Sequence, residues 1–138
     1  MTKSLITTFR FTGQDSCSES VYEVISFEFG FYQAIDNNSY QPSSRVTLNQ
    51  INLTVKGNNG VEFFDWMISR TDRKECTIEF QVSESETRKI VVKDALCVAY
   101  NERFECYSGS AHMFNVGISA EEIQVNNMTY NVWDSMNS

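Results

Sequence analysis

The sequence NGVEFFDWMISR, residues 59 to 70, decides the fold. It is the only stretch of the chain whose apolar residues recur at helical spacing. Val61, Phe64 and Ile68 form one row along the predicted helix, and Phe63 and Met67 form a second row beside it. Segments before and after this stretch alternate between apolar and polar residues with a period of two. We therefore predict a β-sheet protein with one short amphipathic helix packed on it.

The ends of the predicted helix are marked by residues that suit helix termini. Asn59 can cap the N-terminus, and Glu62 stands three residues later, where its side chain can bond back to the backbone of the cap. Glu62 and Asp65 lie near the positive end of the helix dipole, and Arg70 lies near the negative end. The helix is thus expected to span about Asn59–Arg70.

Alternating segments predict antiparallel strands on both sides of the helix. A short polar turn at residues 83–87 indicates that the strands flanking it pair as a hairpin, and Asn126-Asn127 favours a tight turn between the last two strands. The fold is predicted as mainly β, an antiparallel barrel or sandwich of two sheets, in a single domain over residues 1–138. The predicted strands are Leu5–Thr12, Val21–Phe31, Val46–Lys56, Cys76–Val82, Arg88–Tyr100, His112–Val125 and Met128–Val132.

Three strands carry details that bear on which side chains are buried. Val21–Phe31 is expected to place the row of Ile25, Phe27, Phe29 and Phe31 on one face. Arg88–Tyr100 is expected to carry one apolar row, made of Ile90, Val92, Leu96, Val98 and Tyr100. Asp94 interrupts this row and then needs a polar partner or solvent. In Val46–Lys56 the parity of the apolar residues changes, which predicts a β-bulge near residues 49–50.

The segment Ala34–Arg45 is the least regular part of the chain and holds its only proline. A loop of this length inside a small domain is often functional. The alternative interpretation is a surface excursion without a function.

Composition and charge exclude several classes of protein. The formal net charge is −7, which argues against binding to nucleic acid and against adhesion to an anionic membrane. No apolar run is long enough for a signal peptide or for a membrane span. We expect the protein to be made in the cytoplasm and to leave the cell only by a route that reads no cleaved signal.

No catalytic constellation is recognisable, so we predict that the protein is not an enzyme and carries no metal or cofactor. His112, the only histidine, is expected to be a partly buried strand residue, with a ligand or base role as the alternative. Adjacent glutamates at 121 and 122 point to opposite faces of a strand unless the strand bends there. The cysteines at 17, 76, 97 and 106 form no C-x-x-C pair and are expected to be reduced and mostly buried.

Three stretches resemble the tube protein of the type VI secretion system, the Hcp or TssD family, in the form found in Bacteroidota. They are Phe63–Met67 with the following Arg70–Phe80 segment, Lys93–Tyr100 with Phe104 shortly after, and Ile118–Ile123. Together they cover about the last 80 residues in the family's order and spacing. Glu121 departs from the pattern, because a basic residue is commoner there.

The resemblance implies a structural subunit of a contractile injection system. Such subunits form hexameric rings that stack into a hollow tube, which a sheath drives out of the cell behind a spike, with effectors as cargo. In the family, the loop between the second and third strands reaches neighbouring subunits. Carried onto this sequence, that loop is Ala34–Arg45, and the candidate contact residues are Tyr40, Gln41, Pro42 and Arg45.

A different class of function is a monomeric β-sandwich module that binds a small ligand or a glycan. Exposed aromatic rings such as those of Trp66 and Trp133 would line its site. Trp66 is better explained as a helix residue packed on the sheet, and Trp133 as a residue of the C-terminal tail. A binding module needs no ring, so the oligomeric state separates the two hypotheses.

Overall fold

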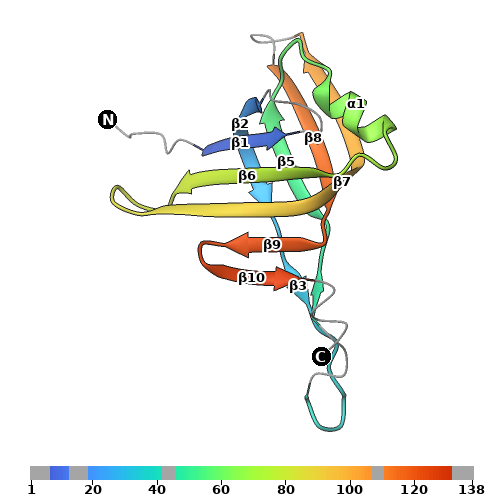
Figure 1. Ribbon diagram of the computed structural model, residues 1–138, viewed down its shortest axis with the longest axis vertical. Coiled ribbons are helices and arrows are strands. Elements are labelled where there is room, and N and C mark those ends of the chain that lie inside the picture. The colour runs from blue at the N-terminus through green and yellow to red at the C-terminus, as the bar shows by residue number, and fades with distance from the viewer. Residues whose placement is uncertain (1–6, 13–18, 42–45, 107–110, 132–138) are drawn as a thin grey trace.

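The computed structural model describes residues 7–12, 19–41, 46–106 and 111–131. It contains ten strands and one helix in these ranges (Figure 1). The elements are β1 Thr7–Thr12, β2 Glu19–Glu28, β3 Phe31–Tyr32, β4 Thr47–Leu48, β5 Ile51–Lys56, α1 Glu62–Ile68, β6 Lys74–Gln81, β7 Thr87–Glu105, β8 Ala111–Ser119, β9 Glu122–Val125 and β10 Met128–Asn131.

The strands β7-β6-β1-β2-β5-β8 close into an antiparallel barrel, because β8 pairs back onto β7. β7 spans 19 residues and is the strand at which the barrel closes. Its first part pairs with β6 on one side and with β9 on the other, and its second part pairs with β8. The hairpin of β9 and β10 extends the sheet beyond the barrel, and the predicted mainly β architecture with one helix is confirmed.

The core fills the barrel and continues under α1. Phe63 of the helix is buried against the rings of Phe9, Tyr22 and Phe114, and Trp66 is buried beside Phe63. Trp66 satisfies its indole N–H by donating to the carbonyl of residue 72 at 2.8 Å. Fully buried aliphatic side chains from five strands complete the core: Ile51, Val55, Ile78, Ile90, Val92, Ile118 and Ile123.

The helix is shorter than predicted and presents a different face to the barrel. It begins after Val61, without a side-chain cap, so the predicted cap at Asn59 is wrong. The side chain of Asn58 accepts a bond from Gly60 N–H just before the helix, and Glu62 accepts one from the Tyr22 hydroxyl instead of returning to the cap. The first predicted row, residues 61, 64 and 68, is exposed.

Two local irregularities change the predicted burial in part of β2 and β7. Phe27 and Phe29 pack against the core as predicted, whereas Phe31 is 44% exposed. In β2 the register shifts between Val24 and Ser26, so Ile25 is 55% exposed although it was predicted to share a face with Phe27 and Phe29. In β7 Asp94 has a positive φ of 52°, and burial moves to Ala95 and Cys97 on the other parity. Asp94 is exposed to solvent, which meets the predicted need of this charged side chain for a polar partner or solvent.

The interruption predicted near residues 49–50 separates β4 from β5 rather than forming a simple bulge. Asn49 donates its backbone N–H to the carbonyl of Gly30 at 2.8 Å at this point. Before it the chain pairs with β3, and after it the chain pairs with β2 and β8. The tight turn predicted at Asn126 is confirmed by a φ of 55°.

The cysteines in the described ranges are free. Cys76 and Cys97 are buried as expected, whereas Cys106 is exposed at the end of β7. Burial raises the pKa of Cys97 to about 11. Cys17 lies outside the described residues.

Candidate assembly surfaces

The second half of β2, β5, β8 and the second half of β7 form a four-stranded sheet with two open sides. β1 pairs with residues 19–23 of β2, and β5 pairs with residues 24–28. Beyond residue 95, β7 pairs among the described residues with β8 alone. Backbone groups at both edges of this sheet are therefore available to another strand, unless residues outside the described ranges cover them.

Exposed apolar side chains accompany these edges. Ile25 on β2 is 55% exposed, and Val98 and Phe104 on β7 are 42% and 57% exposed. A groove of about 200 Å³ lies beside the β2 edge, lined by residues 24–27 and by Phe80 of β6. Exposed apolar groups next to unpaired backbone are typical of a surface that another chain covers.

An arm extends from the barrel along the long axis of the molecule, at the opposite end from α1 (Figure 1). We define the arm as residues 31–41 and 46–48. At its root, β3 pairs with β4, and Tyr130 of β10 donates its hydroxyl to the carbonyl of Val46 at 2.6 Å. The rings of Phe31 and Tyr130 also meet, with centroids 5.1 Å apart. These contacts fix the direction in which the arm leaves the barrel.

The tip of the arm is held by short-range hydrogen bonds. Tyr40 N–H donates to the carbonyl of Asp36 at 2.8 Å, and Asp36 N–H donates to the carbonyl of Gln41 at 2.7 Å. The carboxylate of Asp36 accepts the N–H of Asn38 at 2.7 Å. Tyr40 takes a positive φ of 57° in this turn. The turn presents the Tyr40 side chain outward.

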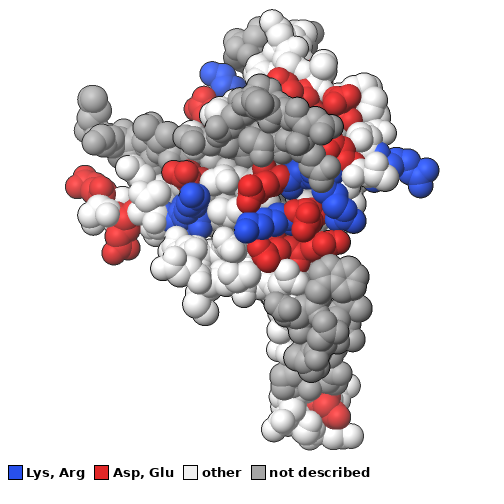
Figure 2. All heavy atoms as spheres, viewed as in Figure 1, with Lys and Arg blue, Asp and Glu red and all other residues white. Residues whose placement is uncertain are grey.

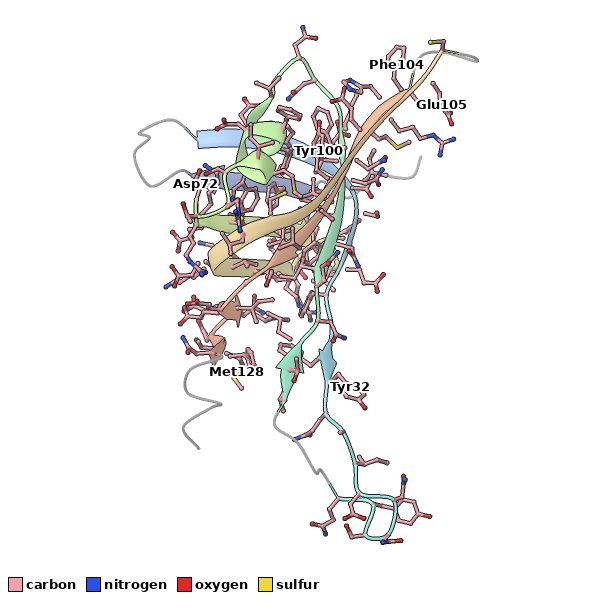
Figure 3. The ribbon with its side chains drawn as sticks, turned by 90° about the vertical axis from the view of Figure 1, so that its right-hand side faces the viewer. Tyr32, Asp72, Tyr100, Phe104, Glu105 and Met128 are labelled. Carbon is pink, nitrogen blue, oxygen red and sulfur yellow. The ribbon has the colours of Figure 1, made fainter. Side chains whose placement is uncertain are left out.

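The side chains of the arm are largely unburied. Tyr40 is 79% exposed, Tyr32 is 61% and Ile35 is 56%. Figure 3 shows Tyr32 pointing away from the barrel. Asp36 is the one charged residue among residues 31–41 and 46–48. In Figure 2, acidic and basic side chains are mixed over the barrel, in contrast to the mostly uncharged arm.

Tyr40 and Gln41, two of the four candidate contact residues, thus lie together at the tip of the arm. Pro42 and Arg45 lie outside the described residues. The sequence pointed to this loop by its turn residues and its length. It gave no sign of the open sheet edges, because an edge is defined by pairing between distant segments.

A cluster of polar and aromatic side chains lies where β7 and β8 run out beyond the barrel. Glu102 accepts the hydroxyl of Tyr100 at 2.7 Å, and its other oxygen lies 2.8 Å from Nε2 of His112. His112 is half-buried between the rings of Phe104 and Phe114, as expected for a strand histidine. Burial and the bond to Glu102 raise the pKa of Tyr100 to about 12.

Hydrogen bonds from Tyr100 and His112 lower the pKa of Glu102 below its ordinary value of 4.5. A lowered pKa means that the contribution of Glu102 to stability is present above the ordinary value and is lost as the pH falls through the lowered value. We expect the difference in unfolding free energy between wild type and Glu102→Gln to shrink between about pH 6 and about pH 3. Urea unfolding measures this difference, with Glu86→Gln in an exposed turn as the control. A difference that is constant with pH would contradict this role of Glu102.

Nothing in the described part of the chain resembles a catalytic or metal centre. No three His, Cys, Asp or Glu side chains within it gather closely enough to hold a metal ion. No helix in the described ranges is long and apolar enough to cross a membrane. Trp66 is fully buried and cannot stack on a ligand, which removes one of the two rings on which the binding-module hypothesis relies. Trp133 lies outside the described residues.

Comparison with known proteins decides the family. The profile described as "Hemolysin coregulated protein Hcp (TssD)" matches residues 4–134. The chain belongs to the Hcp (TssD) family. Its members are tube proteins of the type VI secretion system, which makes this a family of structural, secreted proteins rather than of enzymes. No curated protein sequence matches the chain significantly.

Solved structures share the Hcp fold along nearly the whole chain. Hcp1 from Flavobacterium johnsoniae is 23% identical with a TM-score of 0.74, covering 89% of this chain and 98% of its own. Hcp1 from Salmonella typhimurium is 9% identical with a TM-score of 0.71, covering 96% of this chain and 98% of its own. A chain of the anti-feeding prophage baseplate, solved by cryo-EM with 6-fold symmetrisation, is 12% identical with a TM-score of 0.62, covering 92% of this chain and 96% of its own. At these identities the similarity shows the fold.

Proposed function

We propose that this Hcp-family chain is the subunit of a hexameric ring, and that stacked rings form the hollow inner tube of a type VI secretion system. The tube would carry effectors out of the cell, within a sheath and behind a spike, after synthesis in the cytoplasm. The observation that carries the proposal is the four-stranded sheet with open edges at β2 and β7. The 6-fold symmetrised assembly of a protein with the same fold supports the copy number.

Open edges on opposite sides of one sheet suit a ring. When the β2 edge of one copy meets the β7 edge of the next, the contact joins two different surfaces, and such contacts close into a ring if the rotation between copies allows it. Backbone hydrogen bonds then continue from sheet to sheet. The rest of each barrel lies behind the sheet and takes up more space than the sheet does. It therefore fits on the outside of the ring, where the circumference is larger. The outer face of the sheet is therefore the surface that turns toward the lumen.

The arm supplies a second kind of contact, between a subunit and its neighbours along the tube. It projects along the long axis, away from α1 and from the end of the β7–β8 hairpin (Figures 1 and 3). Its exposed Tyr40 and the adjacent Gln41 are the described contact candidates, and Pro42 and Arg45 follow them in the sequence. Because the described arm is nearly uncharged, we propose that apolar contact and hydrogen bonding hold it on the neighbouring copy.

The solution mass tests the ring. We expect light scattering after size exclusion to give six times 15.9 kDa for the wild type. Ile25→Lys places a charge beside the open half of β2 and is expected to give monomers, because a buried unpaired charge is strongly unfavourable. Val21→Lys is the matched control, since Val21 is 53% exposed but lies in the half of β2 that β1 already pairs.

Two results would overturn the proposed interface. One is a wild-type protein that stays monomeric at high concentration, which would favour a binding module or a non-assembling relative. The other is an Ile25→Lys variant that keeps the hexamer mass, which would place the contact elsewhere. Circular dichroism of each variant shows whether the barrel itself remains folded.

A further inference from the structure

The outer face of the four-stranded sheet carries a hollow of about 220 Å³ with an uncharged polar lining. Its polar lining includes the side chains of Gln50, Asn52, Thr54, Asn101 and Asn115. No charged residue is among the described residues that line it, although charged residues make up 21% of the chain. The hollow is thus distinct in chemistry from the mixed charged surface of the barrel.

Strand register places these side chains in rows across the sheet. Thr54 of β5 pairs with Asn115 of β8, and Asn115 pairs with Asn101 of β7. In the next row, Gly117 stands between Asn52 and Ala99. Since directly paired residues point to the same face, the carboxamides of three strands converge on one site.

Hydrogen bonds within the lining fix which groups remain for a ligand. The Thr54 hydroxyl donates to Oδ1 of Asn115 at 2.7 Å, and Gln50 Nε2 donates to Oδ1 of Asn52 at 3.1 Å. Both asparagines thus use their oxygen inside the lining, which leaves their NH₂ groups as donors. Gln50 keeps its carbonyl oxygen as an acceptor. The hollow therefore offers donors and an acceptor close together.

Gly117 makes room for the hollow. A Cβ at this position would lie 2.3 Å from Nε2 of Gln50 and 3.0 Å from Cβ of Ala99. A side chain here would push the end of Gln50 out of its place and fill the floor. An alanine requires the flexible end of Gln50 to move aside and β7 at Ala99 to shift by a small distance.

We propose that this hollow binds the amide groups of a polypeptide, both side-chain carboxamides and exposed backbone. An amide donates and accepts at neighbouring atoms, which matches the donors of Asn52 and Asn115 and the acceptor of Gln50. The proposal rests on the proposed function in one respect. A transported polypeptide meets the hollow only if the chain forms the ring, and that polypeptide then supplies the amide groups. Six hollows facing one lumen would each bind the cargo weakly, and together these contacts would retain it.

The lining argues against a sugar as the ligand. Sugars are commonly held on an open aromatic face, and Tyr100 is the aromatic residue of this lining. Its ring packs near Phe114 and Phe64, with centroids 6.0 and 6.2 Å away, and its hydroxyl is bonded to Glu102. Tyr100 pairs with the buried Val116, whereas Asn101 pairs with Asn115, so the Tyr100 ring belongs to the inner face of the sheet rather than to the hollow.

The test is a titration of the full-length protein, followed by NMR of its backbone and side-chain amides. The probe is the peptide acetyl-Gly-Asn-Gly-Gln-Gly-amide, with maltotriose as the second probe. We expect saturable shifts for Asn52, Asn101 and Asn115 with the peptide. Asn101→Leu, which removes one amide at similar volume, should weaken binding about five-fold, corresponding to about 1 kcal/mol. Gly117→Ala should abolish the shifts, and Gln81→Leu on exposed β6 should leave them unchanged.

Peptide shifts that persist in Gly117→Ala, or that scatter over the surface, would overturn the proposed site. Equal or tighter binding of maltotriose at the same resonances would assign the hollow to a carbohydrate instead. Light scattering on the same samples separates the two proposals. Hexamers that do not bind the peptide contradict the hollow alone, and monomers that bind it contradict the ring alone.

Discussion

Replacing Phe63 by alanine is expected to destabilise the protein by about 3–5 kcal/mol. Phe63 is 1% exposed, and its ring lies 5.8 Å from that of Phe9, 4.6 Å from Tyr22 and 5.9 Å from Phe114. Removing it opens a cavity between the helix and three strands of the barrel. Because the barrel is rigid, this cavity collapses only in part. Urea unfolding followed by circular dichroism measures the loss.

The adjacent residue is a matched control for this prediction. Phe64 has the same side chain on the same helix but is 52% exposed, with its ring 6.2 Å from that of Tyr100. We expect Phe64→Ala to cost less than about 1 kcal/mol, since a partly exposed ring loses little burial. Similar losses for the two variants would contradict the orientation of α1.

Substitution of the arm is expected to separate ring formation from tube formation. The double variant Ile35→Ala and Tyr40→Ala removes two side chains that are 56% and 79% exposed. Their removal should change the unfolding free energy by less than about 0.5 kcal/mol, because neither side chain packs on its own barrel. Rings should keep the hexamer mass, whereas tubes seen by electron microscopy under conditions where the wild type stacks should disappear.

Met128→Ala controls for the loss of an exposed apolar side chain in general. Met128 is 77% exposed on β10, outside the arm, and we expect this variant to form tubes as the wild type does. Raising the salt concentration should leave arm contacts largely intact, because the described arm has a single charge. Tubes of normal length from the arm variant would show that other surfaces hold the rings together.

Elements with strong local signals were predictable from the sequence. The hairpin between β6 and β7, the tight turn at Asn126 and the existence of the one helix all follow from turn residues and periodicity. Cys76, which was expected to be buried, lies in the core. The fold class and the family are therefore predictable from the sequence alone.

The buried face of α1 was not predictable, nor were the points in β2 and β7 at which the buried face changes, for physical reasons. A bulge changes which parity is buried, and nothing near Ile25 marks the register shift in β2. At Asp94 a charged residue interrupts the apolar row and so indicates an irregularity, but this pattern does not predict that Ala95 and Cys97 become the buried residues. The helix has only seven residues, so two apolar rows compete, and tertiary packing selected the one with Phe63.

Of the candidate surfaces, the arm was predictable from the sequence, whereas the open sheet edges and the hollow were not. The arm is a local feature, marked by its turn chemistry and by the single proline that follows Gln41. The open edges of the sheet depend on where β1 and β6 stop pairing, which is a property of the closed barrel. The hollow above Gly117 depends on register between three strands, and the sequence of one strand carries no information on it.

The 19-residue β7 has a mechanical consequence for the proposed tube, which a contracting sheath would push. Its contour length is about 60 Å, at roughly 3.3 Å per residue. β8 and β9 follow one another along the same side of it, so this ladder continues past the bend at Asp94. A force directed along β7 therefore loads the ladder in shear. Its hydrogen bonds must then yield together rather than one after another, as they would in a hairpin pulled open from its end.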